Sequence, residues 1–188
     1  MRLLVAALLI CVSPSTAFKI LVYNSNFAHS HSNFIGSIAD ILVDAGHNVT
    51  SLIPVIDRNG KDGTAKSNKI HVHLTEDVWK AREAALGSYD IMFDTPYLDP
   101  VGTFFASRGM SDMLVKGCKL TLEKSELIEQ LKREEYDVMM AENFDMCGIG
   151  LGHLIQPKSF ISVQSMNVFG LHYDEFGISP GLTYVPSE

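Results

Sequence analysis

The stretch that decides the fold runs from Lys19 to His47 and reads KILVYNSNFAHSHSNFIGSIADILVDAGH. Its uninterrupted apolar and aromatic run over residues 20–23 predicts a short strand that is buried on both faces. A polar loop follows, and apolar residues then recur with helical spacing, with polar residues on the opposite face. We expect Ser32 to cap the start of this helix, and Gly46 to end it in a left-handed conformation.

A second strand is predicted over residues 48–53, directly before Pro54. Strand, loop, helix and strand in this order form a crossover connection, which joins parallel strands. Strands and helices continue to alternate along the chain. Further strands are predicted at residues 70–74, 136–141 and 159–163, and helices at 76–86, 101–115 and 146–155. One more helix carries Leu122, Leu127, Ile128 and Leu131, and residues 89–93 are either a strand or a helix. The pattern predicts an α/β fold, a Rossmann-like parallel sheet with helices on both faces.

The first 17 residues have the pattern of a secretory signal peptide. Arg2 precedes an apolar run over residues 3–12, and small residues at 15–17 form a cleavage site. No later segment reaches the roughly 18 consecutive apolar residues that a transmembrane helix requires. We therefore expect a single domain over residues 18–188, in the endoplasmic reticulum lumen or secreted, with no transmembrane helix after signal cleavage.

Charge and cysteine content narrow the function classes further. The formal net charge is −7 without a cluster of basic residues, which argues against nucleic acid and anionic membranes as partners. Outside the signal peptide, Cys118 and Cys147 are the two cysteines, and they either form a disulfide or remain as free buried thiols. The segment Asn48-Val49-Thr50 is an N-glycosylation sequon, although it opens a strand predicted to be buried.

His31 is the first candidate for chemistry. It lies after the carboxyl end of the first predicted strand and at the start of a helix, where open α/β sheets bind ligands. The helix dipole disfavours a second positive charge there, and a neutral imidazole beside a hydroxyl group acts as a general base. The alternative interpretation is a solvated loop histidine or a secondary helix cap.

Glu142 is the second candidate, because it directly follows the strand that ends at Ala141. His31 and Glu142 are about 110 residues apart but are predicted on the same edge of one sheet. A carboxylate that binds one imidazole nitrogen fixes the tautomer and stabilises the imidazolium. The alternative is an acid at a helix N-terminus or a supporting salt-bridge partner.

Two other motifs give weaker signals. The segment Gly148-Ile149-Gly150-Leu151-Gly152-His153 fails the dinucleotide-binding pattern, because its glycines lie inside a predicted helix and its sixth position is histidine. Packing of this helix against the sheet explains the small residues better. His71 and His73 alternate on one strand face with metal-ligand spacing, but no third ligand is at a recognisable offset, so no metal site is predicted.

Several segments together resemble the animal UDP-glucuronosyltransferases: residues 26–34 and 46–50, 127–142, and 182–186. The resemblance implies the N-terminal, acceptor-binding lobe of a GT-B glycosyltransferase, which is metal-independent, inverts the anomeric carbon, needs no cofactor and uses a UDP-sugar as donor co-substrate. It places the catalytic base at His31, and its carboxylate partner, usually aspartate, at Glu142, with Asp145 as an open alternative. Phe34, Asn143 and Phe144 are the expected acceptor-binding residues.

The implied reaction transfers glucuronate or another hexose to the hydroxyl group of a small lipophilic acceptor. The sequence lacks the UDP-sugar signature of the C-terminal donor domain and the C-terminal membrane anchor of the family. We therefore expect this chain alone to be inactive. The alternatives are a non-catalytic, secreted or lumenal acceptor-binding protein, a regulatory protein that forms dimers with full-length relatives, and an incomplete gene sequence whose real product continues past Glu188. The acceptor, the donor sugar and the oligomeric state stay open.

Overall fold

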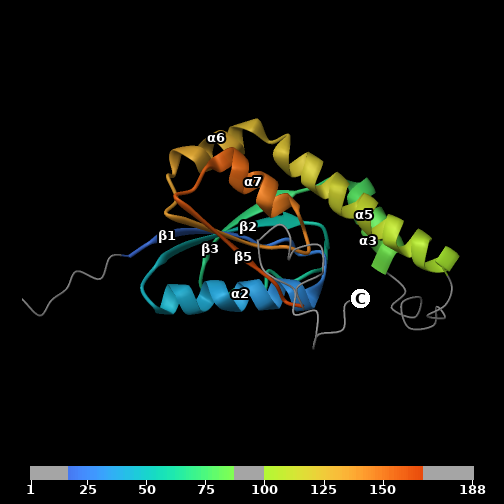
Figure 1. The fold of residues 1–188 in the computed structure, drawn as a ribbon, viewed down its shortest axis with the longest axis horizontal. Helices are drawn as coiled ribbons and strands as arrows, with labels where there is room; N and C mark the ends of the chain where they lie inside the picture. Colours follow the sequence, from blue (N-terminus) through green and yellow to red (C-terminus); the bar gives the residue numbers. More distant parts are fainter. Residues whose placement is uncertain (1–16, 87–99, 167–188) are drawn as a thin grey trace, which may run out of the picture.

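The computed structural model describes residues 17–86 and 100–166, which form a five-stranded parallel sheet with helices on both faces (Figure 1). The strands are β1 (Lys19–Tyr23), β2 (Asn48–Val55), β3 (Asn68–His73), β4 (Val138–Glu142) and β5 (Ser159–Val163), and the helices are α2 (His29–Asp44), α3 (Glu76–Leu86), α5 (Pro100–Leu122), α6 (Ser125–Arg133) and α7 (Cys147–Ile155). The strand order is β3-β2-β1-β4-β5. The predicted α/β architecture is confirmed.

Helix α2 covers one face of the sheet, and α6 and α7 cover the other (Figure 1). Successive side chains of a strand point to opposite faces, so each strand contributes to two cores. In β1, Leu21 and Tyr23 join the large cluster on the α7 side, whereas Ile20 and Val22 join the smaller cluster on the α2 side. All four are buried. This explains why the first strand has an uninterrupted apolar sequence.

Helix α2 begins earlier than predicted. Its first residue is His29, and Ala28 is the N-cap, with no capping side chain. The prediction that Ser32 is the cap is wrong, because Ser32 lies within the first turn, where its hydroxyl donates to the Ala28 carbonyl oxygen at 3.2 Å. The predicted end is confirmed: Gly46 has φ +90° and its amide donates to the Val43 carbonyl at 2.9 Å.

Strand β2 is two residues longer than predicted, because it continues through Pro54 to Val55. The carbonyl oxygens of Leu52 and Pro54 both point toward β1, where they accept from Asn24 and Asn26. The nitrogen of Pro54 faces the same side, and β1 has already ended at Tyr23 there. A proline therefore fits in this strand, because no ladder hydrogen bond requires its missing N–H.

The second half of the chain differs from the prediction in its helix lengths. Helix α5 extends to Leu122, so this residue ends α5 and does not belong to the helix that carries Ile128. The segment predicted at 89–93 lies outside the described residues. None of the described helices is both long and apolar enough to cross a lipid bilayer.

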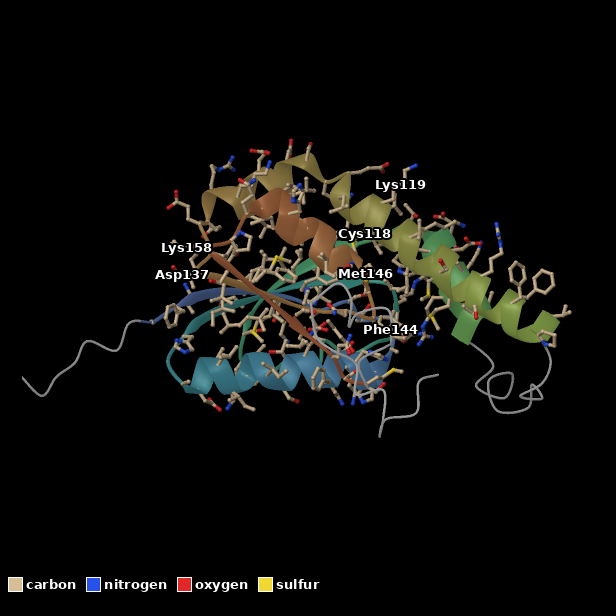
Figure 2. All side chains as sticks on the ribbon, viewed as in Figure 1. Cys118, Lys119, Asp137, Phe144, Met146 and Lys158 are labelled. Atoms are coloured by element: carbon tan, nitrogen blue, oxygen red, sulfur yellow. A yellow bond between two sulfur atoms is a disulfide. The ribbon has the colours of Figure 1, made fainter. Side chains whose placement is uncertain are left out.

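Cys118 of α5 and Cys147 of α7 form a disulfide. Of the two alternatives that the sequence leaves open, the structure therefore has the disulfide and not the free thiols. The bond joins two helices on the same side of the sheet (Figure 2). It closes a loop with a sequence separation of 29, which restricts the unfolded chain more than the folded one.

Candidate functional site

The candidate site lies where the direction of chain winding reverses. From β1 the chain passes through α2 to β2, whereas from β4 it passes through α7 to β5, on the other side of the sheet. Strands β1 and β4 are neighbours, so the two connections leave the carboxyl edge in opposite directions. This reversal is the place at which open α/β sheets bind ligands.

His31 and Glu142 are in contact at this edge. His31 lies in the first turn of α2, and Glu142 is the last residue of β4. His31 Nδ1 lies 2.7 Å from Glu142 Oε1, and the exposed fractions of the two side chains are 12% and 9%. The two residues that the sequence places at one edge of the sheet are therefore brought together as a largely buried pair.

Two phenylalanine rings hold the imidazole in place. The ring centroids of Phe27 and Phe144 each lie 4.8 Å from that of His31. The two phenylalanines also stack on each other, with centroids 5.3 Å apart and planes 9° from parallel. Phe144 lies beside the N-terminal end of α2 (Figure 2). This contact restricts rotation of the imidazole, so that Nδ1 keeps facing the carboxylate.

The hydrogen bonds of Glu142 keep it ionised. Burial raises the pKa of this carboxyl group, but hydrogen bonds from His31 and Ser165 outweigh burial, and the pKa lies below its ordinary value. An ionised carboxylate can only accept hydrogen bonds, so Nδ1 of His31 must carry a hydrogen. In a neutral ring, Nε2 is then the nitrogen that can accept a proton. Among the described residues, Nε2 of His31 makes no hydrogen bond.

The lowered pKa of Glu142 leads to a prediction for stability. A carboxyl group whose pKa is lower in the folded state stabilises the fold at pH values above the ordinary pKa of the group, which is 4.5 for glutamate. This contribution is lost as the pH falls through the pKa of the folded state. We expect E142Q to lower the free energy of unfolding by about 1 kcal/mol at pH 7, because a neutral amide accepts weaker hydrogen bonds. Urea unfolding from pH 7 to pH 3 should show the difference from wild type closing at low pH. A difference that is constant over this range would contradict the assignment.

Asp145 and His29 are not part of this pair. Asp145 accepts from the Tyr23 hydroxyl at 3.1 Å and from the Cys147 amide at 3.0 Å, on the α7 side of the sheet. Burial raises the pKa of Asp145 above its ordinary value, and these hydrogen bonds oppose the rise only in part. His29 is exposed and contacts Asn33. Glu142, and not Asp145, is therefore the carboxylate in contact with the imidazole of His31.

Of the three residues expected to bind an acceptor, Phe144 is the one whose ring contacts that of His31 among the described side chains. Phe34 packs against the core on the α2 side, and Asn143 is buried and accepts from the Ser162 hydroxyl. Their role as acceptor-binding residues stays a prediction. Sequence reasoning missed Phe27 and Ser165. Ser165 follows β5, which ends at the same edge directly beside β4, and that position was the available signal.

The glycine-rich segment has a packing role. A Cβ added at Gly148 would lie 2.4 Å from the Ala141 Cβ, and one at Gly152 would lie 2.8 Å from the Phe160 ring. These glycines allow α7 to approach the sheet closely, as the sequence indicated.

The histidines of β3 lie away from the candidate site. His71 Nε2 contacts Asp62 at 2.9 Å. Within residues 17–86 and 100–166, no three His, Cys, Asp or Glu side chains are arranged to hold a metal ion. A hollow of about 560 Å³ lies between residues 70–73 and 123–127 and includes neither His31 nor Glu142. This hollow is thus separate from the imidazole–carboxylate pair.

A comparison with protein families gives a match over nearly the whole chain. The family model described as "UDP-glucoronosyl and UDP-glucosyl transferase" matches residues 18–187. UDP-glucuronosyltransferase 3A2 of Homo sapiens is 30% identical over 192 residues, which cover 98% of this chain and 34% of that protein. The ugt-48 protein of Caenorhabditis elegans is 26% identical, over 99% of this chain and 36% of that protein. The chain spans about a third of the length of these curated relatives.

A comparison of folds gives a consistent result. The crystal structure of CalG4, the calicheamicin glycosyltransferase, superposes with a TM-score of 0.50 at 10% sequence identity. The match covers 87% of this chain and 38% of CalG4. At this identity the similarity concerns the fold alone, and it agrees with the prediction of one lobe of a GT-B glycosyltransferase.

Proposed function

Since the chain belongs to the UDP-glucuronosyl and UDP-glucosyl transferase family, we propose that this domain binds and activates the acceptor in a sugar transfer from a UDP-sugar. His31 is the general base, Glu142 is its carboxylate partner, and the acceptor is a small lipophilic molecule that carries a hydroxyl group. The observation that carries the proposal is the 2.7 Å contact between His31 Nδ1 and Glu142 Oε1, beside the switch point of the sheet.

In the proposed reaction, Nε2 of His31 removes the proton of the acceptor hydroxyl as its oxygen attacks the anomeric carbon of the UDP-sugar. The bond between that carbon and the phosphate oxygen breaks, and UDP leaves with the electron pair. The attack takes place opposite the leaving group, so the configuration inverts. Glu142 stabilises the imidazolium that forms. General-base catalysis of this kind contributes about 10²–10⁴ to the rate.

The surroundings of His31 favour an apolar acceptor. Phe144, which is partly buried, presents an aromatic ring directly beside the imidazole, and aromatic faces bind flat apolar molecules by stacking. Phe34 and Asn143 are the further residues proposed to contact the acceptor. No metal or cofactor takes part in the proposed step.

The test is a transfer assay with a panel of UDP-sugars and lipophilic phenols and alcohols, with product stereochemistry determined by NMR. The proposal requires a β-linked product from an α-linked UDP-sugar. It also requires acceptor binding by the domain itself, measured by saturation-transfer NMR without donor. Acceptor binding with no transfer, even when a donor-binding lobe of a relative is supplied, contradicts catalysis and favours an acceptor-binding or dimerising regulatory protein. A retained configuration contradicts the mechanism.

We also propose that the protein enters the secretory pathway, and Asn48 provides a prediction that tests this. Asn48 is exposed at the start of β2, at the edge of the sheet opposite to His31, while Val49 is buried. A glycan on Asn48 would therefore extend into solvent without disturbing the core. In cells with an endoplasmic reticulum, we expect peptide N-glycosidase to increase the gel mobility of the wild type and of N68Q, but not of N48Q. An unchanged mobility of the wild type would contradict the proposed location.

A further inference from the structure

We infer that Ser165 is a positioning residue, which acts with Glu142 to hold His31 in the tautomer that can accept a proton on Nε2. The kinetic consequence of this inference rests on the proposed function. Its structural part, the tautomer of His31, can be tested without any transferase activity. It concerns a residue that lies 134 positions from His31 in the sequence.

Ser165 contacts both members of the pair. Its hydroxyl group donates to Oε1 of Glu142, and its backbone amide lies 3.3 Å from the same oxygen. Its Oγ also lies 3.2 Å from Nδ1 of His31. Glu142 Oε1 is thus surrounded by three donor groups, two from Ser165 and one from His31.

The directions of these hydrogen bonds are determined by the carboxylate. Because Glu142 is ionised, the Ser165 hydroxyl gives its one hydrogen to Oε1, so Oγ has none left to donate to Nδ1 and can only accept from it. An acceptor at Nδ1 favours the tautomer with a hydrogen on that nitrogen. Glu142 and Ser165 therefore present two acceptors to one N–H, and both disfavour a hydrogen on Nε2.

The fold explains why Ser165 reaches this position. Val163, the last residue of β5, lies in register with Glu142, the last residue of β4. The amide of Asn143 donates to the Val163 carbonyl at 3.0 Å, which ties the two strand ends together. The chain that leaves β5 then passes over the Glu142 carboxylate two residues later. The ends of β1, β4 and β5 thus each contribute a segment to one hydrogen-bonded group.

The first experiment reads the tautomer directly by ¹⁵N NMR of histidine-labelled chain, with the His31 signals assigned by their loss in H31Q. In the wild type at neutral to basic pH we expect Nδ1 protonated and Nε2 unprotonated. In S165A we expect the ratio of the two tautomers to fall about tenfold, because one hydrogen-bonding partner is lost. S165T, which keeps the hydroxyl group, should restore the wild-type spectrum, and S159A, at the other end of β5, should not change it.

The second experiment measures kinetics in a form of the protein that transfers sugar. We expect S165A to lower kcat by the fraction of His31 that leaves the reactive tautomer, which is at most about tenfold, with little change in KM for the acceptor, and S165T to recover most of it. An unchanged tautomer ratio in S165A, or a ratio altered equally in S165T, would overturn the inference. If the spectra change as expected but no transfer is found, Ser165 has its positioning role and the proposed function fails, so the two failures are distinguishable.

Discussion

Replacing His31 with glutamine is expected to lower the turnover number of sugar transfer by about 10²–10⁴, the usual contribution of a general base. Glutamine can still donate a hydrogen bond toward Glu142 and can still pack against Phe27 and Phe144, so we expect little change in stability. It cannot accept a proton from the acceptor hydroxyl. The measurement is kcat at saturating UDP-sugar, in the chain alone or with a donor-binding lobe supplied, whichever gives turnover.

The matched control for H31Q is H29Q. His29 lies one half-turn away on α2, is exposed and contacts Asn33, so its replacement should leave kcat within about twofold of wild type. A ligand-binding titration separates binding from chemistry: the acceptor Kd of H31Q should stay close to that of the wild type. An H31Q protein with normal turnover would remove His31 from the mechanism, and a loss in H29Q as large as in H31Q would point to damage of α2 as a whole.

Gly148→Ala is expected to lower the free energy of unfolding by about 2–3 kcal/mol. The added methyl group would lie 2.4 Å from the Cβ of Ala141 and 3.1 Å from the ring of Tyr23. Ala141 is fully buried in β4, so its Cβ moves only if the strand moves. Helix α7 must therefore shift away from the sheet. Thermal and urea unfolding measure the loss, with the disulfide intact in both proteins.

Gly150→Ala is the matched control, two residues along the same helix. A Cβ at this position meets nothing within 4 Å, so the better helix propensity of alanine should increase stability by up to about 1 kcal/mol. The two substitutions are chemically identical and differ only in what the methyl group contacts. Equal stabilities of the two variants would contradict the close packing of α7 on β4.

The amino-acid sequence alone predicted the architecture, because its signals are local. The apolar run of β1, the helical spacing that follows it and Gly46 at the helix end depend on neighbours within a few residues. The sequence also indicated that His31 and Glu142 share one edge of the sheet, since parallel strands place their carboxyl ends together. The start of α2 was predicted four residues too late, because the first turn of this helix has no capping side chain from which it could be recognised.

Tertiary structure decided the rest, because those contacts join segments that no local pattern relates. The choice of Glu142 over Asp145 depends on which side of the sheet each carboxylate faces, and the two lie only three residues apart. The pairing of Cys118 with Cys147 depends on the packing of α5 beside α7. Ser165 reaches the imidazole because β5 pairs in register with β4. Local sequence patterns specify which elements form, whereas the distances between side chains at the strand ends depend on how the whole sheet is assembled.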